Sequence, residues 1–135
     1  ITNQPYSKLL NKKKAKRPFQ IHKVAIKVDK DLLKTLIDKR VNQMINKGLE
    51  DEAIKMFKKQ NLNSLNTVGY KEFFEHFKEN SKLEKTIENI KTNTKKYAKR
   101  QVTWLKRNND YFWIKSTPQK ERLNDVLSHL KKRIK

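Results

Sequence analysis

The residues best placed to do chemistry lie between positions 94 and 106, where the sequence reads TKKYAKRQVTWLK. At about 100° per residue, a helix here has an apolar arc that can face a core and a cationic arc roughly opposite. The apolar arc comprises Ile87, Ile90, Thr94, Ala98, Gln101 and Leu105, and the cationic arc comprises Lys95, Lys96, Lys99, Arg100 and Lys106. Such a helix can pack on one side and contact the phosphates of RNA on the other.

The side chains of this helix are expected to make different kinds of contact with RNA. The three cations that have no packing role, Lys99, Arg100 and Lys106, are predicted to contact backbone phosphates. Gln101 and Thr103 can read base edges or ribose hydroxyls. Trp104 lies beside the cationic arc, and we expect it to be buried against the strand that contains Trp113.

A second candidate segment, SLNTVGYKEF at 64–73, precedes a predicted helix. Thr67, Gly69 and Tyr70 combine a hydroxyl, a flexible backbone and an aromatic ring in one turn. Lys71 falls in the first helical turn, where backbone amides can bind phosphate, and Tyr70 can stack on a splayed base. The alternative is a loop in which Gly69 serves only the backbone geometry.

Composition excludes several kinds of active site. The chain has only two glycines, Gly48 and Gly69, so it contains no glycine-rich phosphate cradle. The absence of cysteine excludes disulfides and thiolate metal sites, and the three histidines are too far apart to suggest a metal site. Glu84 and Glu88 are interpreted as a solvated face. We therefore predict no catalytic residue and no metal site in this chain.

The charge of the chain points to a polyanionic partner. Lys and Arg number 34 against 14 Asp and Glu, a formal net charge of +20, while only 35% of the residues are hydrophobic. A thin core with this charge favours nucleic acid as the partner, although solvated surface lysines are the plainer alternative. We expect no membrane segment, because no apolar run is long enough, and no targeting segment at the start. A cytoplasmic location follows as an expectation.

Hydrophobic periodicity predicts a mainly α chain with two short strands. The predicted strands fall within 19–28 and 111–114. The predicted helices cover a segment capped by Asp29 or Asp31 and ended by Gly48, then 49–60, 70–77, 83–106 with Ser81 as a possible cap, and a last helix opened by Pro118. We divide the chain into a basic loop and core strand at 1–28, a helical region at 29–80, and a long basic helix, strand and C-terminal helix at 81–135.

Four stretches of the chain resemble the tRNA dimethylallyltransferase family, in the same order. They are RPFQIHKVAI at 17–26, VNQMINKGLEDEAIKMF at 41–57, TVGYKEF at 67–73 and YAKRQVTWLKR at 97–107, the last followed by a Trp-containing strand. The resemblance covers essentially the whole chain. It implies a helical insertion plus the C-terminal part of a P-loop-like α/β enzyme, whose two strands complete a sheet begun in an N-terminal half. On this resemblance, the strands near 19–28 and 111–114 should pair with each other.

The resemblance also implies an activity that this chain cannot perform alone. The family transfers a dimethylallyl group from dimethylallyl diphosphate to N6 of the adenine next to the anticodon. Its diphosphate cradle and aspartate base belong to the N-terminal half, so this chain resembles the C-terminal portion and is expected to be catalytically incomplete. Mg²⁺ is implied for the full-length enzyme, with its site outside this chain, and the implied partner is the tRNA anticodon stem-loop.

The resemblance assigns tRNA contacts to two segments. The first comprises Asn66, Thr67, Val68, Gly69, Tyr70 and Lys71, and the second comprises Lys99, Arg100, Gln101, Val102, Thr103, Trp104, Leu105 and Lys106. At the place of Asn66, relatives can carry a basic residue. Arg40 resembles a recurrent family arginine that leans toward the diphosphate, and an ion pair with Asp38 or Glu50 is the alternative. Two other functions remain open: a stand-alone basic helical module that binds RNA or DNA, and a protein-interaction domain with solvated lysines.

Overall fold

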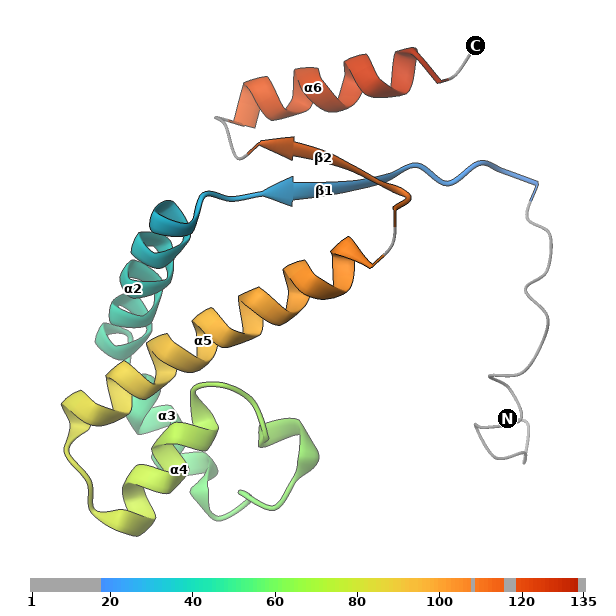
Figure 1. Ribbon diagram of the computed structural model, residues 1–135. Helices are drawn as coiled ribbons and strands as arrows, with labels where there is room; N and C mark the ends of the chain where they lie inside the picture. Colours follow the sequence, from blue (N-terminus) through green and yellow to red (C-terminus); the bar gives the residue numbers. More distant parts are fainter. Residues whose placement is uncertain (1–17, 108, 116–118, 134–135) are drawn as a thin grey trace, which may run out of the picture.

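The computed structural model describes residues 18–107, 109–115 and 119–133 of the chain (Figure 1). The elements are β1 (Lys23–Lys27), α2 (Lys30–Asn46), α3 (Leu49–Phe57), a short 3₁₀ helix (Asn63–Leu65), α4 (Tyr70–Glu79), α5 (Leu83–Lys106), β2 (Tyr111–Lys115) and α6 (Gln119–Lys131). This part of the chain is mainly helical with two short strands, as predicted. Most of the basic loop expected before β1, and Pro118, lie outside the described residues.

The two strands pair as expected although more than eighty residues separate them. They are parallel, with Lys23 opposite Tyr111 and Lys27 opposite Lys115. A parallel pair needs a long crossover, and here the helices from α2 to α5 supply it. Ala25 and Ile114 are buried in this pair, and α6 lies along β2 (Figure 1).

Local sequence signals explain where two of the helices begin. The carboxylate of Asp29 accepts hydrogen bonds from the amides of Asp31 (2.9 Å) and Leu32 (3.3 Å), which caps α2. Gly48, at φ +89°, adopts the left-handed conformation that separates α2 from α3. The prediction that Ser81 caps α5 is wrong: Lys82 is the capping residue without a side-chain bond, and the Ser81 hydroxyl instead lies 3.2 Å from Nδ1 of His76.

The core lies among α2, α3, α4 and α5. Its buried members are Ile37, Val41, Leu49, Ala53, Phe73, Phe74 and Ile90. Aromatic rings of α3 and α4 pack edge to face, with the centroids of Phe57 and Phe77 5.4 Å apart. This cluster holds the first half of α5 and the start of α4, the two elements that carry the candidate binding segments.

Candidate nucleic-acid interface

The helix α5 changes character along its length. In its first half Thr86 and Ile90 are only 2% and 1% exposed, because α5 packs there on α2 and α4. The C-terminal part of the helix extends past α4 (Figure 1). All the predicted binding residues from Lys99 to Lys106 are exposed, except the half-buried Leu105. The expected cationic face therefore lies in solvent, on a helix whose other end is anchored in the core.

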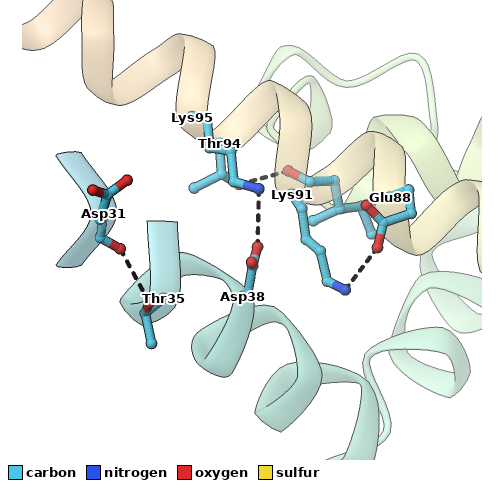
Figure 2. Close-up of polar contacts among 8 residues, drawn as sticks. Asp31, Thr35, Asp38, Glu88, Lys91, Thr94 and Lys95 are labelled. Carbon is cyan, nitrogen blue, oxygen red and sulfur yellow. Dashed lines mark hydrogen bonds and ion pairs between the residues drawn. The ribbon is translucent and has the colours of Figure 1, made fainter. Parts of the chain in front are cut away.

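Two residues of the predicted arcs lie elsewhere. Lys95 was expected on the free cationic face, but its Nζ lies 3.0 Å from Oδ1 of Asp38 on α2 (Figure 2). This pair joins α2 to α5, so Lys95 contributes to helix packing. Gln101 was expected on the packed arc and is exposed. At this position the space between α5 and α2 is occupied by hollows, which Gln101 borders, so its side chain reaches solvent.

The expected burial of Trp104 against the strand of Trp113 is wrong. Its side chain is 61% exposed. Trp104 and Leu105 border a hollow that is also lined by Val28 and by residues of β1 and α2. An exposed tryptophan next to lysines and an arginine is a ring on which a base can stack.

The turn before α4 has the sharp geometry that its glycine predicted. Gly69 has φ +109° and ψ −68°, a conformation that L-residues with a side chain rarely adopt. A Cβ atom there would meet Leu49 only at 3.8 Å, so backbone conformation rather than lack of space requires glycine. Gly69 is buried, whereas Asn66, Thr67, Val68 and Lys71 around it are exposed.

Tyr70, which we expected to stack on a base, is held within the protein at its hydroxyl and on one face of its ring. Its hydroxyl donates a hydrogen bond to Oε1 of Glu52 at 2.5 Å, and its ring stacks on Phe74 with centroids 6.0 Å apart. The pKa of Tyr70 is raised, mainly by the hydrogen bond to Glu52 and to a smaller extent by burial. One face of the ring is thus occupied within the protein, and Tyr70 supports the turn.

Glu72 was missed by the sequence reasoning and is central to the structure. Its side chain is 4% exposed, Oε2 accepts a hydrogen bond from the Gly69 amide at 2.7 Å, and Oε1 accepts one from Nδ2 of Asn93 on α5, also at 2.7 Å. Its position offered a signal: Glu72 lies three residues after Gly69, the residue that precedes α4. A glutamate at this position commonly accepts a hydrogen bond from the backbone amide at the start of the helix. Asn93 carried no signal in sequence.

The structure divides the predicted residues between two sides of the turn. On one side Val68 borders a hollow between α2 and α5, together with Arg40, Tyr97 and Gln101. On the other side Asn66 and Lys71 border a polar recess, lined also by Gln60, Asn63 and Lys78. The structure therefore brings Arg40, Val68 and Gln101 together, and it separates them from Asn66 and Lys71. Asp38 pairs with Lys95, and among the described residues no ion pair joins Asp38 to Arg40.

The described side chains provide no metal centre. No three His, Asp or Glu residues within these ranges lie close enough together to hold an ion. Among the described helices, none has the length and apolar character needed to cross a membrane.

Comparisons with known proteins agree on one family. Residues 1–108 match the family model described as IPP transferase. Over 134 residues the chain is 39% identical to a protein named tRNA dimethylallyltransferase 2 from Parabacteroides distasonis, and over 126 residues it is 37% identical to a tRNA dimethylallyltransferase from Christiangramia forsetii. These alignments cover 99% and 93% of this chain but 44% and 42% of the relatives. The chain thus spans less than half the length of these curated relatives.

Solved structures give the same result at the level of the fold. The full-length tRNA isopentenylpyrophosphate transferase from Bacillus halodurans superposes with a TM-score of 0.77 at 28% identity, over 84% of this chain and 39% of that one. The tRNA delta(2)-isopentenylpyrophosphate transferase from Staphylococcus epidermidis gives a TM-score of 0.74 at 27% identity, over 82% and 38%.

Proposed function

Because the chain belongs to the IPP transferase family, we propose that it is the tRNA-gripping portion of a tRNA dimethylallyltransferase. The whole enzyme would transfer a dimethylallyl group from dimethylallyl diphosphate to N6 of the adenine next to the anticodon of a tRNA in the cytoplasm. The observation that carries the proposal is the exposed cationic end of α5, anchored through its buried first half. A stand-alone RNA- or DNA-binding module is less favoured, because the relatives are named as transferases along this same stretch.

The exposed end of α5 supplies contacts of two kinds. Lys99, Arg100 and Lys106 project charge into solvent and are suited to the phosphates of an anticodon stem-loop. The Thr103 hydroxyl donates to the Lys99 carbonyl at 2.9 Å, so toward RNA it can act only as an acceptor. Gln101 retains both donor and acceptor groups, which makes it the better reader of a base edge.

The hollow between α2 and α5 is the proposed place for the reacting adenine. Chemistry on a base in a loop requires that the base leave its stack and enter a water-poor site. Val68, Tyr97 and Leu36 give this hollow apolar walls, while Gln101 and Arg40 place polar groups on its border. We assign to Arg40 a contact with the diphosphate of the prenyl donor, since it is exposed there and free of the Asp38 carboxylate.

The remaining catalytic parts are assigned to a portion of the enzyme upstream of this chain. Two glycines do not build a diphosphate cradle, and the described residues hold no cluster of three or more His, Asp or Glu side chains. In the whole enzyme Mg²⁺ would neutralise charge on the diphosphate leaving group. The residues of this chain bind and orient the tRNA, and they wall the site against water.

A transfer assay tests the proposal. Anticodon stem-loop RNA and labelled dimethylallyl diphosphate are incubated with the 135-residue chain, and separately with a chain extended upstream to the full length of its relatives. We expect labelled RNA only with the extended chain. Transfer by the 135 residues alone would contradict the assignment of the catalytic parts. RNA binding without transfer by either chain would favour the stand-alone binding module.

A further inference from the structure

Glu72 is a buried carboxylate that joins two elements. It belongs to the first turn of α4, yet one oxygen accepts from the backbone of the turn at Gly69 and the other accepts from the Asn93 side chain on α5. Among the described residues no Lys, Arg or His forms an ion pair with it, so two hydrogen bonds of 2.7 Å offset the cost of burying the charge. We call the Gly69–Glu72–Asn93 connection the clasp.

The clasp acts on both candidate binding segments. On the turn side it holds the amide of Gly69, the residue with the unusual backbone angles, and thereby sets the path of residues 66–71. On the helix side it holds Asn93, and Arg100 lies seven residues further along α5, two turns away on almost the same side. A rotation or slide of α5 relative to α4 would break the Asn93 bond and redirect Arg100.

Apolar packing alone would leave this register loose. The neighbours of the clasp in α4 and α5 are hydrophobic residues such as Phe73 and Ile90, whose contacts have no direction. Two charge-assisted hydrogen bonds to one rigidly buried carboxylate do have direction. From this geometry we propose that Glu72 is a positioning residue for tRNA binding: through Gly69 and Asn93 it fixes the turn at 66–71 and the cationic end of α5 in one register. This inference rests on the proposed function.

The test exploits the polarity of the Glu72–Asn93 bond. Asn93→Asp places two carboxylates in contact and breaks the clasp. Adding Glu72→Gln to Asn93→Asp places a side-chain NH₂ donor opposite a carboxylate acceptor. The single side-chain oxygen that Glu72→Gln leaves at position 72 can still accept from the Gly69 amide. The net charge returns to that of the original chain. Glu72→Gln alone is also expected to preserve the clasp, because the Asn93 amide can turn over and present its oxygen. Asn89→Asp is the matched control, since it adds the same charge at an exposed position one turn earlier.

Affinity for an anticodon stem-loop is measured by fluorescence anisotropy at a temperature where circular dichroism shows every variant folded. We expect Asn93→Asp to weaken binding about tenfold more than Asn89→Asp does, the equivalent of about one charge-assisted hydrogen bond. The double variant should return to within about twofold of the original chain, as should Glu72→Gln. A purely structural role would change the unfolding temperature without this pattern in the affinity of folded protein.

The outcomes separate the two proposals. If the original chain binds and Asn93→Asp binds as well as Asn89→Asp does, the positioning role is overturned while the proposed function stands. Failure of the double variant to recover affinity would also overturn the positioning role. If the original chain does not bind the stem-loop, both proposals fall together.

Discussion

The two halves of α5 have different surroundings: the first is packed against other helices, and the second is exposed to solvent. The first half contributes Thr86 and Ile90 to the interior and is tied to α2 and α4 by Lys95 and Asn93. The second half exposes Lys99, Arg100 and Lys106 together with Val102 and Trp104. One continuous helix is therefore a structural element at its start and a recognition surface at its end. Mutations in the two halves should affect different properties.

The largest effect is expected in the packed region. Phe73 is fully buried against α5, so Phe73→Ala removes a whole aromatic side chain and leaves a cavity. We expect the free energy of unfolding to fall by about 3–5 kcal/mol, measured by urea denaturation. A loss below about 1 kcal/mol would show that the core does not anchor α5 as described.

Trp104→Ala probes the exposed end of the same helix. Because the side chain is 61% exposed, we expect the free energy of unfolding to change by less than about 0.5 kcal/mol. Binding to an anticodon stem-loop should weaken by about 1–3 kcal/mol if the ring stacks on a base. The opposite pattern, a large loss of stability with unchanged affinity, would place Trp104 in the packed half.

Tyr70→Phe tests whether the hydroxyl of the turn residue supports the packed region or contacts RNA. The change removes the hydrogen bond to Glu52 and keeps the ring against Phe74. We expect about 1 kcal/mol less stability and unchanged affinity for the stem-loop. Tyr70 is neutral at pH 7, because its pKa is raised from 10.0, so the result should not depend on pH near neutrality. Weaker RNA binding with full stability would return Tyr70 to the recognition surface.

The smallest expected effect is a pH dependence of stability around the sheet, which belongs to neither half of α5. His129 stacks on Phe112, and its pKa is lowered by burial and by the nearby charges of Arg133, His22 and Lys132. His129 is therefore harder to protonate in the folded state than in the unfolded state. The stability that neutral His129 contributes is present above about pH 6.5 and is lost as pH falls below it.

Hydrogen exchange in β2 and α6 should accordingly rise between pH 7.5 and pH 5.5, after correction for the intrinsic rate. In the His129→Phe variant, which keeps a stacked ring without a titrating group, this rise should disappear. A rise of equal size in His129→Phe would assign the pH dependence to other groups.

Periodicity and end signals predicted the fold well, because each depends on a few neighbouring residues. The strands themselves, the Asp29 cap and the turn at Gly48 were predicted from such signals, whereas the pairing of the strands was predicted from the family resemblance. The division of the chain into regions 1–28, 29–80 and 81–135 stays a proposal.

The errors on α5 share one cause, which is that they depended on partners distant in sequence. The pairing of Lys95 with Asp38, the exposure of Trp104 and the bond between Glu72 and Asn93 are set by how α5 crosses α2 and α4. A helical wheel gives the direction of a side chain and does not give what lies in that direction.

The account rests most directly on the cations at the exposed end of α5, and the salt dependence of tRNA binding tests them. Lys99→Ala combined with Arg100→Ala should reduce the slope of log affinity against log salt by about 1.4–1.8, which is about 0.7–0.9 for each lost phosphate contact. Lys58→Ala combined with Lys59→Ala removes the same charge from exposed positions after α3 and should leave the slope nearly unchanged. An equal slope in both double variants would contradict the assignment of α5 as the surface that grips tRNA.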